Sequence, residues 1–502
     1  MGGTIALLDF ALAGLGIWLA KRLLAKKPAA PLPPGPKPLP IIGNVTDLPK
    51  TQEWLTFAGW GKQYGGIIYV DALGQPMMIV NDAKIAFEML DKKSAIYSDR
   101  PVLIMASILT GWKNTLALSP YGHRFREYRK HLFRLMGSRA NVEPQIDLIE
   151  TQTHSFLKMT LAKPEAVSMN IRKSTGAIIL YMVYGYKVKE ETDELVALVD
   201  LATDQFSQMS APGAYLVDVF PALQYMPTFI TPFKQRAVAW KKTLCDMADL
   251  PFNLVKANMA KGTAESSFSS NLLDSKQLTP EEEDIVKWSA ASLYGGGADT
   301  SVSSVYSFFL AMTLFPNVQK KAQAEIDAVI GHERLPTHAD RERLPYVNAL
   351  VTEVLRWNPV APLGVPHRVM EDDIHDGYFI PKGTIIIANL WNMLHEPERY
   401  PNPLEFSPER FLDQNPQEDP RTMCFGFGRR ICPGLQLADV SVWISCAMSL
   451  AVFDITKKLD ENGIPIVPVP KYTDGTISHP EPFKCIIKPR STKAEELILL
   501  EH

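Results

Sequence analysis

The stretch Phe425-Gly426-Phe427-Gly428-Arg429-Arg430-Ile431-Cys432-Pro433-Gly434 places a single cysteine in a glycine-punctuated loop that leads into a helix. A thiol at a helix N-terminus has its thiolate form favoured by the helix dipole and by unpaired backbone N–H groups. The two neighbouring arginines favour the anion further. Because Pro433 has no N–H, any backbone donors to the sulfur must come from later residues such as Gly434. We therefore expect Cys432 to be a thiolate.

A thiolate held by backbone donors is a good axial ligand for haem iron, and an arginine two residues earlier can reach a haem propionate. The alternative is a buried structural cysteine in an ordinary glycine-rich turn. The spacing Phe-x-x-Gly-x-Arg-x-Cys-x-Gly is met at every fixed position, and it resembles the haem-binding signature of cytochrome P450 monooxygenases. The resemblance implies haem b as the cofactor, Cys432 as its metal ligand, and a cofactor-binding loop made by Phe425, Gly428, Arg430, Cys432 and Gly434.

Composition indicates a globular protein with a large core. The 502 residues are 46% hydrophobic and 21% charged, which is typical of globular chains. The formal net charge of −3 gives no argument for nucleic-acid binding. Five cysteines include no C-x-x-C pair, and their odd number argues against a disulfide framework. A reducing compartment is the simplest inference.

The N-terminus predicts a membrane anchor. From Thr4 to Ala20 the chain is apolar apart from Asp9, and four basic residues follow between positions 21 and 27. This pattern predicts a single-pass transmembrane anchor over residues 1–20 with the remaining chain in the cytoplasm. A cleaved signal peptide and a short amphipathic helix on the membrane surface are the alternatives. Residues 21–40 are basic and then proline-rich, which predicts a stiff linker before a folded domain of residues 41–502.

The folded part is mainly helical in pattern, with a small β component. Two strands separated by a glycine-containing turn are predicted at residues 67–70 and 76–80. Further strands are expected at 378–380 and 384–388, on either side of a Pro-Lys-Gly turn, and near 484–487. We therefore expect one mainly α domain.

The longest predicted helix begins at Thr279-Pro280-Glu281-Glu282, which combines a capping box, a proline at the first helical position and acids at the positive end of the dipole. No interior proline interrupts the pattern before Phe315-Pro316, a length of about 54 Å. Such a helix crosses a whole domain. In its middle lies Gly295-Gly296-Gly297-Ala298-Asp299-Thr300-Ser301.

This central stretch predicts a proton relay. Three interior glycines cost roughly 1 kcal/mol each relative to alanine, which a close approach to a flat group would explain. Thr300 can bond back to a carbonyl one turn earlier and locally open the helix for a water, and Asp299 lies beside it. Tight helix–helix packing through small residues is the alternative. Residues 296–301 also resemble the oxygen-activation motif of the same family, which implies a catalytic role for Asp299 and Thr300.

A basic helix is predicted from residue 121 to residue 134. Taken alone, a solvated basic face explains such a run. In the resembled family this helix crosses the proximal side of the haem, where an aromatic residue and an arginine four residues later hold a propionate and outer basic residues dock the reductase. Arg129 matches that arginine. Phe125 stands where the family usually has tryptophan, so the indole N–H donor is missing.

Two further motifs resemble the family. Glu353 and Arg356 share a helical face, and Arg410 follows in Pro408-Glu409-Arg410-Phe411. Exposed pairs of this kind are common and weak, but the family likeness implies a buried structural network of these three residues behind the haem loop. His367 matches a position at which many relatives bind a propionate.

The four motifs occur in family order. The sequences of residues 361–367 and 211–215 resemble those of the membrane-bound fungal branch associated with secondary metabolism. The resemblance implies the cytochrome P450 fold with the long central helix over the haem. It also implies an endoplasmic-reticulum location with the catalytic domain facing the cytoplasm. Stretches that line the pocket in relatives are largely apolar here: 102–112, 205–229, 291–294, 361–365 and 475–478.

The activity implied is oxidation of a small lipophilic molecule by O2. The chain has no flavin or nicotinamide fingerprint, so the electrons should come from a separate reductase, the NADPH-cytochrome P450 reductase of the shared membrane. Three alternatives stay open: a haem-thiolate isomerase or dehydratase that uses no external electrons, a non-catalytic haem-binding protein, and a membrane-anchored scaffold without haem.

Overall fold

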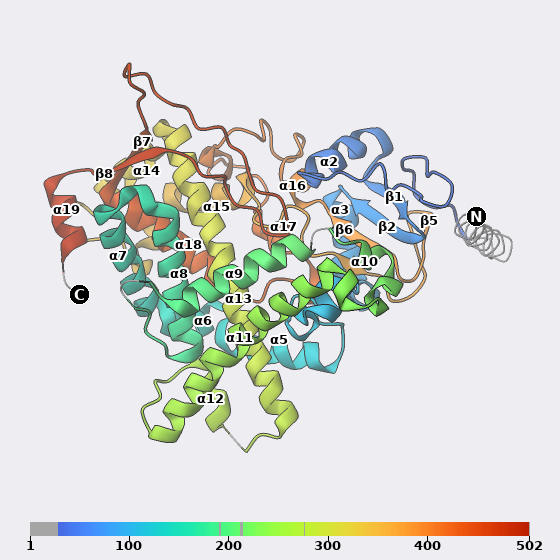
Figure 1. Ribbon diagram of the computed structural model, residues 1–502. Helices are drawn as coiled ribbons and strands as arrows, with labels where there is room; N and C mark the ends of the chain where they lie inside the picture. The colour runs from blue at the N-terminus through green and yellow to red at the C-terminus, as the bar shows by residue number, and fades with distance from the viewer. Residues whose placement is uncertain (1–28, 190–191, 211–213, 276, 501–502) are drawn as a thin grey trace.

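The computed structural model describes residues 29–189, 192–210, 214–275 and 277–500 (Figure 1). The predicted anchor at residues 1–20 lies outside this part. Helices dominate the described chain, as predicted. The longer ones are α2 (Glu53–Tyr64), α5 (His123–Met136), α7 (Ile146–Ala162), α8 (Val167–Tyr184), α9 (Glu194–Ser210), α11 (Pro232–Lys261), α13 (Pro280–Leu314), α14 (Pro316–Val329), α15 (Pro345–Trp357) and α18 (Leu435–Val452).

Shorter helical elements connect and cover these. The short α-helices are α3 (Ala83–Ala86), α4 (Ser94–Tyr97), α6 (Arg139–Val142), α10 (Leu216–Val219), α12 (Phe268–Asp274), α16 (Leu390–Leu394), α17 (Arg421–Cys424) and α19 (Thr492–Leu499). Two turns are π-helical, η1 (Phe87–Lys92) and η2 (Ile104–Leu109). The 3-10 turns are η3 (Trp112–Asn114), η4 (Glu143–Gln145), η5 (Pro164–Ala166), η6 (Pro221–Tyr225), η7 (Thr228–Ile230), η8 (His338–Arg343), η9 (Pro408–Phe411) and η10 (Gly428–Arg430).

Helix α13 crosses the middle of the molecule (Figure 1). Its predicted capping box is present, because the Thr279 hydroxyl accepts the Glu282 N–H at 3.3 Å and the Glu282 carboxylate accepts the Thr279 N–H at 2.9 Å. From Ile285 to Thr313 most of its side chains are buried against α8, α9, α11, α5 and α18. The helix therefore forms the centre of the core.

The strands form three small sheets. The largest has the order β1-β2-β6-β3, with β1 (Ile67–Ala72) and β2 (Gln75–Val80) antiparallel. Their two-residue turn, Leu73-Gly74, has positive φ at both positions, as hairpin turns of this length favour. Strand β6 (Ile385–Ala388) runs parallel to β2 and antiparallel to β3 (His367–Arg368).

The other two sheets are single hairpins. Strand β4 (Asp373–His375) pairs with β5 (Tyr378–Ile380), and β7 (Phe453–Lys457) pairs with β8 (Cys485–Pro489). The strands predicted at 378–380, 384–388 and 484–487 are confirmed, but the first two belong to different sheets and do not pair with each other. Strand β7, the partner of β8, was not predicted.

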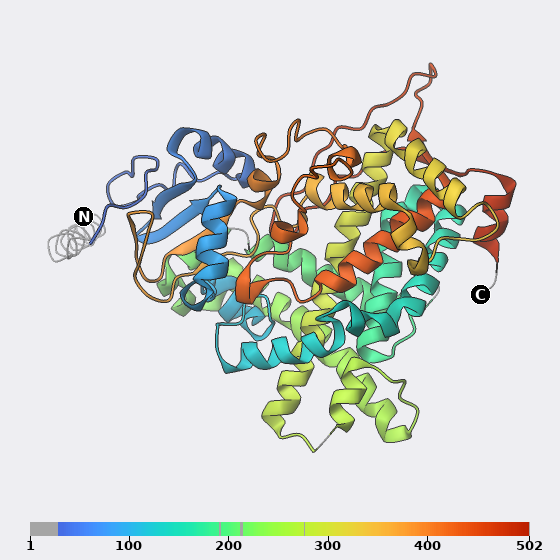
Figure 2. The ribbon, with the colours of Figure 1, turned by 180° about the vertical axis from the view of Figure 1, so that it is seen from behind.

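Helix α18 is the most apolar helix of the core. Among residues 29–500 described by the structure, it is the one single helix long and apolar enough to cross a membrane. Helices α13 and α14 pass that test only as a pair, and they meet at 106°. Since 61% of α18 is buried inside the protein, it is a core helix. Sheet β1-β2-β6-β3 and α2 lie at the end nearest residue 29, and the long helices fill the rest (Figures 1 and 2).

Candidate functional site

Cys432 lies in the loop between η10 and α18. Its backbone N–H donates to the Phe425 carbonyl at 2.8 Å, which closes the loop. The Gly434 N–H donates toward the sulfur, as expected from the missing N–H of Pro433. A Cβ at Gly434 would lie 3.7 Å from the Cys432 sulfur, in ordinary van der Waals contact.

Gly428 is required by close packing. Its φ is +52°, and an added Cβ would lie 2.3 Å from the Leu90 carbonyl oxygen, so no larger residue fits without moving the backbone. The loop is thereby pressed against η1. The ring of Phe427 also meets Phe87 of η1 edge to face, with centroids 5.2 Å apart.

Burial and its neighbours act in opposite directions on the expected Cys432 thiolate. Burial raises the pKa of the Cys432 thiol above its usual value, and the Gly434 N–H and the Arg129 guanidinium only partly oppose this. Arg429, expected to favour the anion, instead donates to the Tyr121 hydroxyl at 2.7 Å. A metal ion that replaces the thiol proton would favour the anionic sulfur further.

Three buried or half-buried guanidinium groups surround the loop, and the hydrogen bonds they make are to backbone carbonyls. Arg430 donates to Ser98 at 2.7 Å and Ser119 at 2.8 Å. Arg129 donates to Ile431 at 2.6 Å. The third guanidinium, Arg100, donates to Ala117 at 2.9 Å and Val365 at 2.6 Å.

This cluster carries excess positive charge. Burial lowers the pKa of Arg430 to about 10 and also lowers the pKa of Arg100 and Arg129. The carboxylate that offsets Arg100 and Arg430 is Asp99, which is already held by Arg368 in an ion pair. Buried cations need anionic partners. The cluster therefore fits a group that carries two carboxylates, as haem b does with its propionates.

Phe125 stands where the resembled family usually has tryptophan, so it offers no indole N–H donor. Its side chain is buried, and the Arg430 guanidinium carbon lies 3.9 Å from its ring centroid. A guanidinium over an aromatic face is stabilised by the ring quadrupole. Phe125 therefore supports Arg430 through its ring face.

His367 lies beside the same arginines and is fixed by Tyr97, whose carbonyl oxygen is 2.7 Å from Nδ1. Burial and the nearby Arg100 hold the pKa of His367 well below its usual range. A neutral ring that donates from Nδ1 has Nε2 as an acceptor. Donation from Nε2 to a propionate therefore requires a second proton on this ring.

Asp299 lies in an ion-pair network that brings together three distant segments. Arg172 of α8 donates to Asp299 Oδ1 at 2.7 Å and to Asp200 of α9 at 3.1 Å. His479 of the C-terminal loop places Nε2 3.2 Å from Asp299 Oδ2. Burial raises the pKa of Asp299, but His479 and Arg172 together outweigh burial and hold it below the ordinary value. Asp299 is therefore an ionised carboxylate.

Thr300 makes the back-bond predicted for it, because its hydroxyl donates to the Gly296 carbonyl at 2.8 Å. Helix α13 runs unbroken through this point, so the predicted local opening is absent. The three glycines differ in their surroundings. Gly296 faces open space, whereas a Cβ at Gly297 would lie 2.6 Å from Ile179 of α8. Tight helix packing thus explains one glycine, and an open face beside Thr300 explains another.

Glu353, Arg356 and Arg410 form a buried network. Arg356 holds Glu353 through two bonds of 2.6 and 2.8 Å, and Arg410 Nε lies 3.1 Å from the same carboxylate. The side chains of Glu353 and Arg356 are fully buried. Arg356 also donates to the carbonyls of Leu394 and Glu405, so the network ties α15 to the segment that precedes η9.

Comparison with known proteins identifies the family. A model described as cytochrome P450 matches residues 33–486. The chain is 52% identical over 477 residues to cytochrome P450 monooxygenase 208 of Postia placenta, covering 94% of this chain and 93% of that protein. It is 47% identical over 503 residues to cytochrome P450 monooxygenase claR of Ampulloclitocybe clavipes, covering 99% and 93%. This chain belongs to the cytochrome P450 family.

As a cytochrome P450 the protein is a monooxygenase, and the cofactor of its family is haem b with a cysteine thiolate ligand. The cationic cluster and the cysteine loop fit that cofactor. A third relative, cytochrome P450 monooxygenase ppsD of Aspergillus oryzae, is 42% identical over 480 residues, covering 93% of this chain and 90% of that protein. The relatives named here come from fungi.

Three of the stretches noted in the sequence lie close to one another in this P450. The rings of Trp112 and Phe206 are in contact at a tilt of 41°, with centroids 4.5 Å apart. Ser210 lies 2.7 Å from Thr476. Ser303 of α13 donates to the Ser478 carbonyl at 2.5 Å. The stretches 102–112, 205–210 and 475–478 therefore lie side by side over α13.

Four charged residues of the site were missed by sequence reasoning. They are Arg100, Arg172, Asp200 and His479, each of which lies outside any motif that the sequence displays. In the sequence, Arg100 is only one of two charged residues before a proline, in Asp99-Arg100-Pro101, and this pattern does not indicate a role in the site. Arg172 and His479 are far from Asp299 in sequence, and only the fold brings them to it.

Proposed function

We propose that this P450 hydroxylates or otherwise oxidises a small lipophilic molecule in secondary-metabolite biosynthesis, using two electrons from NADPH delivered by a separate reductase. The observation that carries the proposal is the buried, ionised Asp299 between Arg172 and His479, one residue before Thr300. A monooxygenase must deliver protons from water to a buried centre. These residues are suited to that task.

The proposed relay runs from the surface to the open face of α13. The side chains of Arg172 and Asp200 are about one-third exposed, whereas that of Asp299 is 7% exposed. Asp299 takes up a proton when its contact with Arg172 loosens, and the Thr300 hydroxyl orients the water that receives it next. Bound haem supplies the reductive activation of O2.

The site residues take separate roles in this proposal. Cys432 would ligate the iron of bound haem, and Gly434 donates to its sulfur. Arg129, Arg430 and the previously unpredicted Arg100 hold the propionates, with Phe125 and His367 beside them. Phe425 and Gly428 shape the loop, while the buried network of Glu353, Arg356 and Arg410 supports haem incorporation without taking part in chemistry.

An isomerase or dehydratase that uses no external electrons is the second class of candidate. Such chemistry needs no protons from solvent, so it gives no reason for a surface-linked acid beside Thr300. The presence of both residues favours the monooxygenase route over this class and over a non-catalytic haem-binding protein.

Docking of NADPH-cytochrome P450 reductase is proposed on α5. Arg126, Lys130 and Arg134 are exposed and recur every four residues, which places them on one helical face. Phe125 and Tyr128, on the opposite face, are buried. A stripe of exposed cations attracts an acidic partner, and α5 also supplies Arg129 to the candidate site, so electrons would arrive close to the haem.

Membrane attachment at the endoplasmic reticulum is proposed through residues 1–20 as an anchor and 21–40 as a linker, with residues 41–502 facing the cytoplasm. An apolar surface supports it. Leu216, Tyr225 and Phe229 are 69%, 83% and 81% exposed, and Ile41 is 53% exposed. These segments lie at the end of the molecule nearest residue 29 (Figures 1 and 2). Large exposed apolar side chains so placed suit contact with lipid.

The test uses full-length holoenzyme reconstituted with a NADPH-cytochrome P450 reductase in lipid vesicles. Lipophilic candidate compounds are first selected by the shift that they cause in the haem absorbance, and turnover is then run under 18O2. We expect product that carries one 18O atom and that forms only with NADPH and reductase. Conversion without NADPH, or product without label, would contradict the proposal and support the isomerase class.

The relay is tested in the same system with Thr300→Ala and its control Thr300→Ser. The alanine variant is expected to bind haem and consume NADPH while releasing most of the reducing equivalents as hydrogen peroxide. Thr300→Ser retains a hydroxyl and should stay coupled. Tight coupling in Thr300→Ala would remove Thr300 from the relay.

A further inference from the structure

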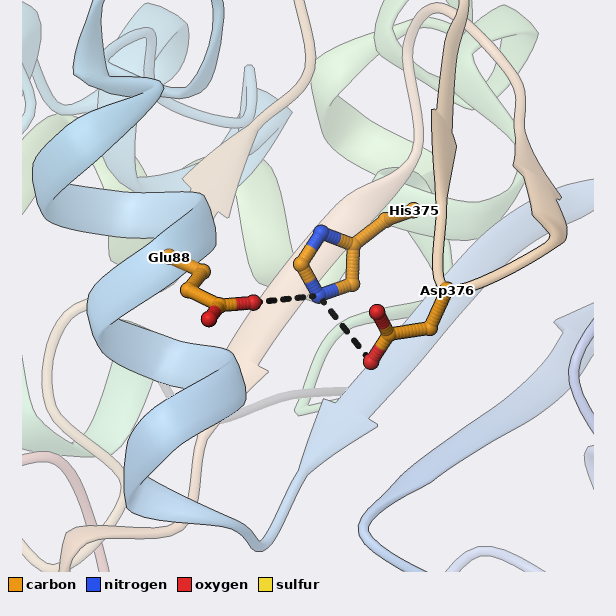
Figure 3. Close-up of side chains that lie close together, drawn as sticks. All are labelled: Glu88, His375 and Asp376. Carbon is orange, nitrogen blue, oxygen red and sulfur yellow. Dashed lines mark ion pairs between the residues drawn. The ribbon is translucent and has the colours of Figure 1, made fainter.

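One cluster of metal-ligating side chains lies apart from the candidate haem site (Figure 3). Glu88 projects from the π-helical turn η1, His375 ends strand β4, and Asp376 follows in the turn to β5. One nitrogen or oxygen atom of each residue lies within 4.8 Å of the others. The three side chains converge on one point, with the imidazole between the two carboxylates (Figure 3).

The imidazole at the centre has an unsatisfied nitrogen. His375 is 5% exposed, and its Nε2 has no hydrogen-bond partner. The nearest carboxylate oxygens are 3.7 Å away on Glu88 and 3.6 Å away on Asp376, which is too long for a hydrogen bond. A buried polar nitrogen left unpaired costs roughly 1–3 kcal/mol. Its direction toward two carboxylates points to a missing cation.

These separations match a small divalent ion. Tetrahedral zinc binds histidine nitrogen and carboxylate oxygen at about 2.0–2.2 Å, which sets neighbouring donor atoms about 3.4 Å apart. The observed 3.6 and 3.7 Å are close to that value. Direct hydrogen bonds would instead draw the pairs below about 3.2 Å.

We propose that Glu88, His375 and Asp376 bind a single Zn2+ ion, with a water molecule as the fourth ligand. Imidazole together with carboxylates suits zinc better than magnesium or calcium, which prefer oxygen alone. The side chain of Asp376 is 59% exposed and that of Glu88 29% exposed, so the ion has access from solvent and a position for water.

The local fold holds the ligands in place. Asp376-Gly377 is a two-residue hairpin turn with φ of +48° and +78°, a geometry that aspartate-glycine favours. This turn brings Asp376 back beside His375. The neighbouring Lys93 is not the cation of the cluster, because its ammonium pairs with Asp373 at 2.7 Å.

The ion would join two parts of the fold that are far apart in sequence. Glu88 lies in η1, whose Phe87 contacts Phe427 of the cysteine loop, and the other two ligands lie on the β4–β5 hairpin. Zinc would therefore clamp the hairpin to the element that packs behind this loop. The role is structural, because none of the three ligands is among the residues of the candidate haem site.

The test uses untagged full-length holoprotein, stripped with a chelator and titrated with ZnCl2 against a chromogenic zinc chelator. Zinc is counted by elemental analysis separately from haem iron. We expect one zinc per chain. Loss of a ligand, as in His375→Gln or Asp376→Asn, should weaken zinc affinity at least roughly tenfold relative to the natural protein. His332→Gln is the matched control, because His332 lies 3.6 Å from a single carboxylate, Asp327, and should leave binding unchanged.

Thermal unfolding supplies a second reading. Zinc at a concentration that just saturates the natural protein should raise Tm of the natural protein and of His332→Gln, and should raise Tm of Asp376→Asn by less. Asp376 is exposed, so this variant keeps the fold even if His375→Gln does not. The proposal is overturned if the natural protein takes up less than one zinc, or if Asp376→Asn binds it equally well.

Discussion

Arg172 donates from Nη1 to Oδ1 of Asp299 at 2.7 Å, and the same nitrogen lies 3.1 Å from Asp200. One half-exposed guanidinium thus links a surface carboxylate on α9 to a buried carboxylate in the centre of α13. In the proposed relay, this link connects solvent to the interior.

Replacing Asp299 with asparagine should slow turnover about 100-fold, the order expected for loss of a proton-transfer group. The variant keeps the size of the side chain, and its one amide oxygen can still accept from Arg172, so haem content should not change. Turnover of reconstituted enzyme is measured in H2O and D2O, and a larger solvent isotope effect is expected. Arg172→Lys, which retains a positive charge, should lose far less. Equal rates and isotope effects for Asp299→Asn would exclude Asp299 from proton delivery.

Glu353→Gln should be severely destabilising, because it leaves Arg356 buried without its anion. Breaking a buried pair costs about 3–5 kcal/mol. Reduced Tm and reduced haem per chain are the expected measurements. The control is Lys321→Ala, which removes an exposed ion pair with Glu409 and should cost less than about 1 kcal/mol. Similar losses in the two variants would mean that the buried network does not support the haem loop.

The stability of the folded state should depend on pH through Asp218. Burial raises its pKa to about 6, and Oδ1 accepts the Met105 N–H at 2.9 Å. Since the folded-state pKa lies above the unfolded value, the folded state binds the proton more tightly. The resulting stability is fully present below about pH 4 and is lost as pH rises through about 6.

Asp218→Asn should therefore raise Tm by about 1–2 °C at pH 7.5 and leave it unchanged at pH 4. Asparagine is neutral at every pH and still accepts from Met105. The measurement is thermal unfolding at both pH values. The exposed Asp204 of α9 provides the control variant Asp204→Asn, for which no pH-dependent difference is expected. A lower Tm for Asp218→Asn at pH 7.5 would show that the ionised form is the stabilising one.

Charge reversal on α5 tests the reductase surface. The double variant Arg126→Glu and Lys130→Glu should slow reductase-supported haem reduction at least about tenfold at low salt, and the effect should shrink as salt screens the charges. Lys320→Glu, at an exposed lysine of α14, makes a similar change away from α5 and should reduce normally. Reduction by dithionite should be unaffected in all three proteins. Unchanged rates for the double variant would place docking elsewhere.

Local signals predicted the parts of the fold that short segments determine. The capping box at Thr279 predicted the start of α13, and two segments separated by a glycine-containing turn predicted β1 and β2. Strand β7 carries no such turn next to it, because its partner β8 lies about 30 residues later. The pairing of β6 with β2 likewise depends on packing that no local pattern encodes.

The residues of the candidate site likewise fall into two groups, those that local motifs indicate and those that only the fold brings to the site. Cys432, Thr300 and Glu353 lie in motifs with fixed spacing, so the sequence could assign them. His479, Arg172 and Arg100 reach the site only through tertiary contacts, and the raised pKa of the Cys432 thiol follows from burial, which spacing does not reveal. Gly297 is explained by Ile179 of α8, a neighbour that sequence alone could not supply.

The central claim, that Cys432 is the haem ligand, is tested most directly by the carbon monoxide difference spectrum of the dithionite-reduced protein in membranes. The natural protein and Cys424→Ala are predicted to show the red-shifted Soret band of a thiolate-ligated haem, and Cys432→His to show a band at shorter wavelength. A red-shifted band that persists in Cys432→His, or its absence from the natural protein, would contradict the account.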